Sequence, residues 1–299
     1  VRPGGEKSTG HNYRITPADQ IGESFKPKER YRRNVEAIKL LKSIEAEDRR
    51  ATPEEQAILV QYVGWGGLKQ VFSTKGEGQK GWANEVREIR DLLTPEEYRD
   101  ARRSVLNAHY TSPEVIGAMW QGLEEMGLQG GSIAEPAMGI GHFFGLMPSS
   151  IAAQSNRLLG VEFDGLTARI AQQLYQSADV RHQGFEATAI GEGAVDLFIS
   201  NVPFGSIETS DAGSRELTNL RAPIHDFFFS KAIRKVRPGG LVVFITSRFS
   251  MDKVNGKFRK DWQQHADLVG MVRLPFTAFK GSSNTEVVTD IVVFQRRPE

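Results

Sequence analysis

The sequence predicts an α/β protein in which a largely parallel sheet is covered by helices on both faces. Short apolar runs alternate with helical stretches from Ser132 onward, a pattern typical of parallel strands joined by crossover helices. The last two runs are joined by residues 275–286, which show no helical pattern, so these two strands should pair antiparallel. The 299 residues suffice for one such domain and an accessory segment.

The front of the chain is helical in pattern. Arg30–Glu47 places apolar residues at spacings of three, which builds one apolar stripe. Thr52 and Thr94 each begin a Thr-Pro-Glu-Glu sequence, which is typical of a capped helix start. A Gly-Trp-Gly-Gly sequence lies between them at residues 64–67. The predicted organisation is a flexible leader at residues 1–27, a helical accessory region at 28–104 and an α/β domain at 105–299.

Seven apolar runs in the second part of the chain have the length expected of buried strands. Helical stretches such as Leu166–Tyr175 and Asp226–Val236 fit between most of them. The predicted strands are Ser132–Glu135, Arg157–Glu162, Val180–Gln183, Val195–Asn201, Leu241–Thr246, Leu268–Leu274 and Val287–Gln295.

Composition excludes several classes of protein. The chain has no cysteine, which rules out disulfides, thiolate metal sites and cysteine nucleophiles and fits a cytoplasmic protein. No run of eighteen apolar residues indicates a membrane-spanning helix. Metal-ligand spacing and a Walker A pattern are also missing, so we expect no metal site and no nucleoside triphosphate hydrolysis. A net charge of +1 argues neither for nor against nucleic acid.

A first constellation resembles a cofactor cradle. Glu135-Pro136 ends the first predicted strand, and Gly139 and Gly141 follow, where the backbone can approach a ligand. Glu162 ends the second strand and is placed to accept hydrogen bonds from both ribose hydroxyls of a nucleoside cofactor. A carboxylate before the glycines suits the cationic, phosphate-free S-adenosylmethionine (SAM) better than a dinucleotide. A tight turn between strand and helix is the alternative interpretation.

Two further segments extend this cradle. Phe185 follows the third strand, where its ring can pack on an adenine while Glu186 approaches the adenine amino group. An ordinary core aromatic explains Phe185 equally well. Tyr110 and Thr111 precede a predicted helix start, where hydroxyls and amides could hold the carboxylate of the cofactor. A simple capping segment is the alternative there.

A second constellation ends the fourth predicted strand with Asn201-Val202-Pro203-Phe204. An exocyclic amine is a poor nucleophile because its lone pair is delocalised into the ring. The side-chain oxygen of Asn201 and the backbone carbonyl of Val202 can accept both of its N–H groups and so localise that lone pair. Pro203 stiffens the turn, and Phe204 offers a flat face for a base. A strand-terminating Asn-x-Pro turn is the alternative.

The motif order resembles a known family. His-Tyr-Thr, Glu-Pro-Ala-Met-Gly-Ile-Gly, Val-Glu, Gly-Phe-Glu and Asn-Val-Pro-Phe follow one another as in the amino-methyltransferases, specifically the gamma arrangement of the N6-adenine DNA methyltransferases. The resemblance covers residues 105–297. With Tyr-Val-Gly-Trp-Gly-Gly, the helical front looks like the methyltransferase part of phage- and plasmid-encoded methyltransferase–helicase fusions. Methylation in such proteins would protect mobile DNA from host restriction.

This resemblance implies a Rossmann-like SAM-dependent methyltransferase fold, with a seven-stranded, mostly parallel sheet and an antiparallel last strand. It implies that DNA is the partner, with an adenine flipped out, together with a fused or separate helicase or specificity region. Phe143 and Phe204 would border the target base, and the catalytic residues would be Asn201, Val202, Pro203 and Phe204. The implied cofactor contacts are Tyr110, Thr111, Glu135, Pro136, Gly139, Gly141, Glu162, Phe185 and Glu186.

Two departures and two alternatives accompany the resemblance. Val202 stands where the family usually has proline, but its role is a backbone carbonyl, so activity should survive. The chain stops at Glu299, where gamma enzymes continue into a target-recognition domain, so sequence specificity is expected to be absent, low or supplied elsewhere. Related turns also methylate glutamine in proteins or amino groups in RNA. A non-catalytic binding module with the same fold is the other alternative.

Overall fold

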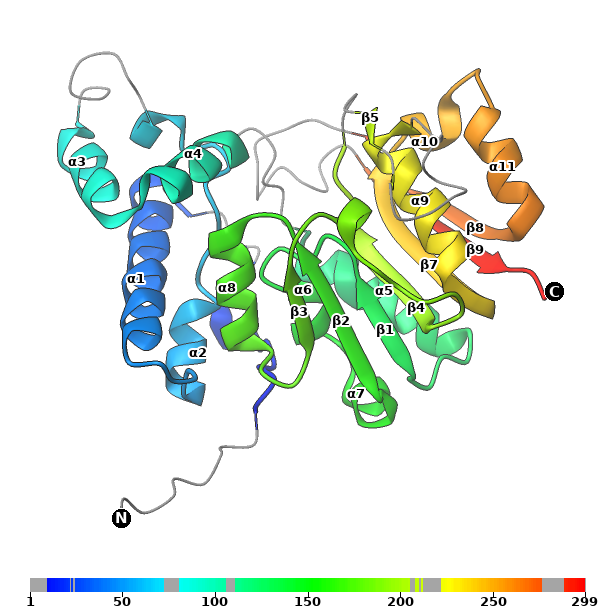
Figure 1. Cartoon of the computed structure of the whole chain (residues 1–299), viewed down its shortest axis with the longest axis horizontal. Coiled ribbons are helices and arrows are strands. Elements are labelled where there is room, and N and C mark those ends of the chain that lie inside the picture. Colours follow the sequence, from blue (N-terminus) through cyan, green and yellow to red (C-terminus); the bar gives the residue numbers. More distant parts are fainter. Residues whose placement is uncertain are drawn as a thin grey trace.

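A seven-stranded sheet forms the centre of the molecule in the order β3-β2-β1-β4-β7-β9-β8 (Figure 1). The computed structural model describes residues 10–21, 23, 25–72, 81–105, 111–204, 208–209, 211, 222–275 and 288–298. Strand β9 runs antiparallel to both of its neighbours, and the other described pairs of this sheet are parallel. The predicted sheet with a reversed last strand is therefore confirmed. Its strands are β1 Ser132–Glu135, β2 Arg157–Glu162, β3 Asp179–His182, β4 Val195–Asn201, β7 Val236–Ser247, β8 Ala266–Arg273 and β9 Thr289–Arg296.

Strand β7 begins five residues earlier than the predicted Leu241–Thr246. The added residues 236–240 include a Pro-Gly-Gly sequence, and Val236 pairs with Val195 across a register shift in β4. Gly240 has no room for a side chain there, because an added Cβ would lie 2.8 Å from the carbonyl oxygen of Asp196. Close approach of two backbones therefore explains a glycine inside this strand.

Helices cover both faces of the sheet, as alternation along the strands requires. In β4, Leu197 and Ile199 join the core beneath α5 and α8, whereas Phe198 joins the core beneath α9 and α11. The helices of this domain are α5 Pro113–Glu125, α6 His142–Gly145, α7 Ser149–Gln154, α8 Gly165–Leu174, α9 Ile224–Lys235, α10 Phe249–Asp252 and α11 Lys257–His265, with the short strands β5 Glu208–Thr209 and β6 Ala222–Pro223 and the 3-10 turn η3 Phe185–Ala187.

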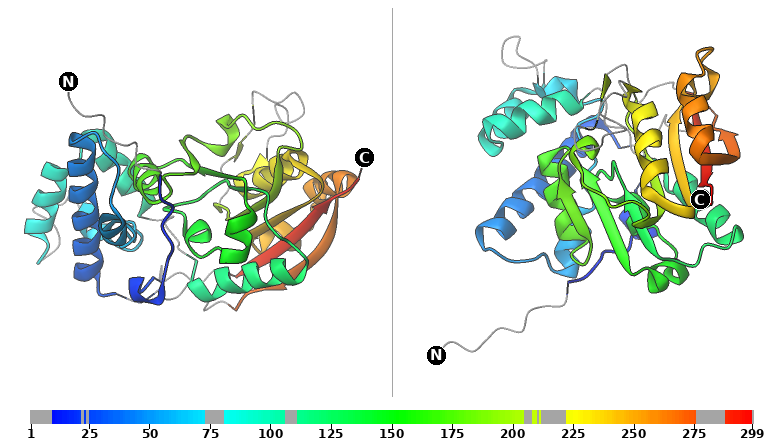
Figure 2. Two further views of the ribbon diagram at one scale, coloured as in Figure 1. Left: turned by 90° about the horizontal axis from the view of Figure 1, so that it is seen from below. Right: turned by 45° about the vertical axis from the view of Figure 1, so that its right-hand side comes forward.

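The accessory helices gather at the end of the molecule nearest β3, opposite the β8–β9 edge (Figure 2). Two of the predicted helix starts are confirmed by complete capping boxes at Thr52 and Thr94. Buried residues of these helices belong to the same apolar core as α5 and α8, so the two parts of the chain share one interior. The accessory elements are η1 Pro17–Asp19, α1 Pro27–Ala46, α2 Pro53–Leu59, η2 Lys69–Phe72, α3 Ala83–Leu92 and α4 Pro95–Ser104.

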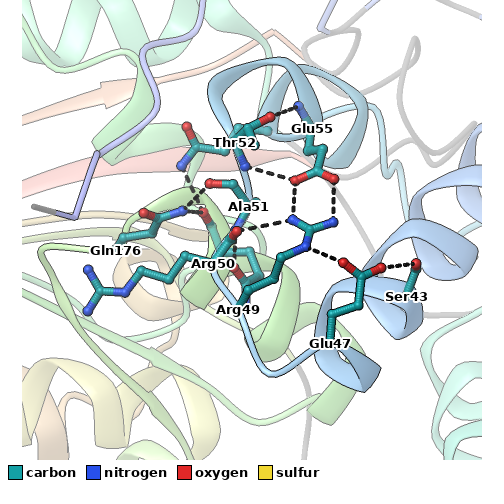
Figure 3. A network of polar contacts seen from close by, with 10 residues as sticks. Ser43, Glu47, Arg49, Arg50, Ala51, Thr52, Glu55 and Gln176 are labelled. Carbon is teal, nitrogen blue, oxygen red and sulfur yellow. Dashed lines mark hydrogen bonds and ion pairs between the residues drawn. The ribbon is translucent and has the colours of Figure 1, made fainter. Parts of the chain in front are cut away.

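A polar network fastens the start of α2 to the α/β domain (Figure 3). The guanidinium of Arg49 donates to both carboxylate oxygens of Glu55 at 2.6 and 2.7 Å. The same carboxylate accepts the backbone N–H of Thr52 at 2.8 Å. The carbonyl of Ala51 then accepts from the side-chain amide of Gln176, just beyond α8, at 2.8 Å. The helix cap and the contact between the two parts therefore depend on one short segment.

Part of the predicted flexible leader, residues 1–27, is ordered against the α/β domain. Tyr13 donates its backbone N–H to the carbonyl of Leu174 at 2.7 Å. Ile15 donates in the same way to the carbonyl of Gly145 at 3.0 Å. The polar composition of this segment gave no indication of these backbone contacts. Its first nine residues lie outside the described part of the chain.

Candidate active site

A cavity of about 610 Å³ opens at the carboxyl ends of β1 to β4. The last residues of three strands (Glu135, Glu162 and Asn201) lie in its wall. The segments predicted to hold a cofactor and those predicted to perform chemistry therefore meet in one space, as expected for a doubly wound sheet. The predicted site residues that line it are Thr111, Glu135, Pro136, Gly139, Phe143, Glu162, Phe185, Glu186, Asn201, Val202, Pro203 and Phe204.

The carboxyl group of Glu135 is the most buried acid of the cavity wall. Its side chain is 1% exposed, and its Oε2 atom has no hydrogen-bond partner. Burial raises the pKa of Glu135 well above its usual value, and the neighbouring Glu162 carboxylate adds to that rise. A buried acid with an unused oxygen beside a second acid favours a cationic ligand.

Glu162 connects the ends of β1 and β2. Its Oε2 accepts the backbone N–H of Gly139 at 2.8 Å, and its Oε1 accepts the backbone N–H of Asp164 at 2.8 Å. Burial raises the pKa of Glu162 to about 7, against the opposing effect of these two N–H groups. The second acid therefore fixes the shape of the glycine loop and also faces the cavity.

The two glycines of the loop have different roles. Both have positive φ values, 56° at Gly139 and 88° at Gly141, which favour glycine. Gly139 lines the cavity, but Gly141 is not among the lining residues. A Cβ on Gly141 would lie 2.3 Å from the ring of Tyr175, whose hydroxyl donates to the carbonyl of Gly141. Close packing against a tyrosine, which lies far away in the sequence, therefore accounts for this glycine.

The side-chain amide of Asn201 is held with its oxygen unused. Its Nδ2 donates to the hydroxyl of Thr111 at 3.1 Å, while its buried Oδ1 has no hydrogen-bond partner. A buried acceptor without a donor is costly in a folded protein, so such an atom indicates a ligand position. Tyr110, which precedes Thr111, lies outside the described residues.

The predicted catalytic turn, residues 201–204, is anchored to the neighbouring strand. The backbone N–H of Val202 donates to the carbonyl of Ile245 at 3.0 Å, and the Val202 side chain is 1% exposed. Burial among the apolar residues beneath α9 suits valine at this position. Phe204 is partly exposed in the cavity wall, and Phe143, predicted to border the target base, is buried there.

Two aromatic residues are candidates for the predicted packing on the adenine of a cofactor. Phe185 lines the cavity but is 2% exposed, and its ring packs in an aromatic cluster whose nearest member is Phe228, 4.9 Å between ring centroids. Phe163 also lines the cavity and is 72% exposed. Sequence reasoning missed Phe163, although its place directly after Glu162 was a usable signal.

The accessory region supplies part of the wall, which sequence reasoning also missed. Tyr62 and Gly64, within the Tyr-Val-Gly-Trp-Gly-Gly sequence, line the cavity. The fully buried side chain of Asn34 holds this turn: it donates to the carbonyl of Gly64 at 2.7 Å and accepts the N–H of Val63 at 2.9 Å. The glycine-rich sequence between the helices was the available signal.

His142 completes the wall beside the glycine loop. It is 7% exposed, and burial lowers its pKa to about 4, so its ring is neutral near pH 7. Among the described residues there is no cluster of three or more potential metal-ligating side chains. The part of the chain that the structure describes also has no helix both long and apolar enough to cross a membrane.

Comparison with known proteins identifies the fold. A scan of protein-family models and a search of curated proteins gave no match. Among solved structures, a putative class I SAM-dependent methyltransferase from Listeria monocytogenes aligns with a TM-score of 0.53 and 17% identity, covering 90% of this chain and 88% of its own. This chain therefore has the fold of the SAM-dependent methyltransferases, as the sequence predicted.

Two restriction-system proteins are similar in structure. The methyltransferase subunit of a type I restriction-modification system from Streptococcus thermophilus aligns with a TM-score of 0.53 and 15% identity, covering 94% of this chain and 68% of its own. A modification subunit of a putative type I restriction enzyme from Vibrio vulnificus aligns with a TM-score of 0.52 and 18% identity over 82% of this chain. The chain spans about half the length of that subunit, 53%.

Proposed function

We propose that this protein transfers a methyl group from SAM to the N6 amino group of adenine in DNA. The unused oxygen of Asn201, buried in the same cavity as the unused oxygen of Glu135, carries the proposal. One atom is an acceptor for an uncharged amine, and the other is an acid suited to a cation. A methyltransferase needs these two functions next to each other.

The residues of the cavity fit SAM. The acidic pair Glu135 and Glu162 matches a cofactor with a positive charge and no phosphate. Glu162 would accept hydrogen bonds from the ribose hydroxyls, and the exposed ring of Phe163 would pack on the adenine beside Glu186. When bound, SAM supplies an electrophilic methyl group, which becomes bonded to the amino nitrogen as the carbon–sulfur bond breaks and a proton leaves to solvent.

The catalytic turn would act on the other reactant. The Oδ1 atom of Asn201 and the backbone carbonyl of Val202 would each accept one N–H of the adenine amine. These two acceptors orient the amine and concentrate its lone pair, so positioning and electrostatics supply most of the rate. Pro203 favours an extended conformation at Val202, which turns that carbonyl outward. Phe204 would stack on the base.

DNA is the substrate that the comparisons favour, because two structural neighbours are modification or methyltransferase subunits of type I restriction systems. An adenine inside a duplex cannot reach the cavity and would have to flip out, at roughly a few kcal/mol. A fused or separate helicase or specificity region would select the site. As the sequence resemblance implies, the role of this protein would be to protect mobile-element DNA in the bacterial cytoplasm.

One experiment tests this function against its alternatives. The protein is incubated with SAM carrying a tritiated methyl group and, in parallel, with unmethylated phage DNA, protein and RNA. We expect label in DNA alone, and N6-methyladenine when the product is identified by mass spectrometry. Label in protein glutamine or in RNA would show that the substrate is protein or RNA instead of DNA. Failure to bind SAM in calorimetry would leave a non-catalytic binding module as the function.

A further inference from the structure

Lys231 on α9 has a buried ammonium group that the proposed chemistry does not use. Its side chain is 1% exposed, and its Nζ donates to the carbonyls of Phe185, Thr188 and Glu186 at 2.7, 2.9 and 3.2 Å. The Nζ also lies 2.6 Å from a carboxylate oxygen of Asp211. A buried charge is costly unless it is paired and hydrogen-bonded, and here four acceptors surround three N–H donors.

The three carbonyls belong to the turn that forms one end of the cavity. Gln183, Gly184, Phe185 and Glu186 all line the cavity, and η3 begins in this segment at Phe185. All three carbonyl groups accept hydrogen bonds from the same ammonium group of Lys231. This turn therefore depends on an ammonium group from α9 for its shape.

The fourth acceptor belongs to the segment after the catalytic turn. Asp211 is 6% exposed, and Thr209, two residues before it, lines the cavity. Strand β5, which contains Thr209, pairs antiparallel with β6 just before α9. Lys231 thus touches both the turn at the expected cofactor end and Asp211, two residues beyond β5.

We propose that Lys231 is a positioning residue that joins the turn at the cofactor end to Asp211, so that the shape of that turn and the placement of Asp211 beside β5 depend on one ammonium group. This inference rests on the proposed methyltransferase function. Burial lowers the pKa of Lys231, and the Asp211 carboxylate opposes that shift, as expected of a pair that holds its charge inside the protein.

The two sets of contacts of Lys231, with the carbonyls of the turn and with Asp211, predict different defects when they are removed. Lys231→Met keeps most of the packing volume but removes every donor, so it should weaken SAM binding about tenfold or more in calorimetry. Asp211→Asn removes the ion pair and leaves the three carbonyl bonds, so SAM affinity should stay within about threefold while kcat for DNA methylation falls about tenfold. Lys235→Met, on the same helix and partly exposed, is the matched control.

A double variant separates positioning from burial of an unpaired charge. If Lys231→Met weakened SAM binding only because the buried Asp211 carboxylate lost its ammonium partner, then Lys231→Met with Asp211→Asn would restore the affinity, and the proposal would be wrong. We expect the affinity of this double variant for SAM to stay low.

Two other results would overturn the proposal. One is wild-type SAM affinity in Lys231→Met. If Lys231→Met does not fold, the Asp211→Asn variant decides, because an unchanged kcat would contradict the proposed link. Failure of the wild-type protein to bind SAM would instead refute the proposed function.

Discussion

The two ends of the cavity differ in charge although they meet at the same edge of one sheet. The end formed by β1 and β2 presents two carboxyl groups, Glu135 and Glu162, both with raised pKa values. The end formed by β4 presents an uncharged amide and an aromatic ring, at Asn201 and Phe204. Carboxyl groups that become charged when a cation binds can select a cation at the first end, whereas a fixed neutral acceptor can orient an amine at the second. Variants that affect one end and spare the other test this division.

The largest effect is expected at the neutral end. Asn201→Ala removes the unused amide oxygen, and kcat for methylation should fall at least about a hundredfold, the usual result of losing one preorganised polar group. Affinity for SAM should change less than about threefold, since this side chain serves the other reactant. Steady-state kinetics and calorimetry measure the two quantities. Asn84→Ala on α3, where the side chain is exposed, is the control. An equal loss of SAM affinity would contradict a division between the ends.

At the acidic end the effect should be on affinity. Glu135→Gln keeps the shape of the side chain but cannot lose a proton and become charged beside a bound cation, so the Kd for SAM should rise about tenfold to a hundredfold, as for losing a charged hydrogen-bond partner. Calorimetry of the variant and of Glu114→Gln, an exposed acid on α5, checks this. Unchanged affinity would show that the buried carboxyl is not what holds the cation.

The pH dependence of SAM binding sharpens the same comparison. A carboxyl whose pKa is raised stays protonated up to that pKa, and protonation removes the charge that attracts a cation. Because the pKa of Glu162 is about 7, affinity should weaken as pH falls through 7, by at most about tenfold per pH unit for one coupled proton. Calorimetry between pH 6 and 8.5 measures the slope. Glu162→Gln should reduce the slope, because it removes one of the two carboxyl groups with raised pKa values, and a slope unchanged in that variant would exclude Glu162 as a cause.

The smallest effect is expected from the exposed ring at the acidic end. Phe163→Ala should raise the Kd for SAM about two- to tenfold, since an aromatic contact contributes about 0.5–1.5 kcal/mol. Phe249→Ala removes a ring that is 53% exposed and is not among the residues lining the cavity, so it serves as the control. Equal behaviour of the two variants in calorimetry would assign the stacking role elsewhere.

Local patterns predicted much of the fold. The predicted bounds of β1, β2 and β4 match the structure, and the caps at Thr52 and Thr94 form as expected. Apolar runs and capping sequences act over a few residues, so a single segment contains the information. Motif order also placed Glu135 and Asn201 at strand ends, and parallel strands bring such ends to one edge.

What the tertiary structure decided involves contacts between residues far apart in the sequence. Gly141 is required by the ring of Tyr175, and the cavity wall includes Tyr62 of the accessory region. The buried ammonium of Lys231 contacts a turn some forty-five residues earlier in the chain. The sequence alone determined the order of the main strands and the residues that end β1, β2 and β4, because those preferences are local. Which side chains share a buried space depends on packing, and only the folded chain brings those partners together.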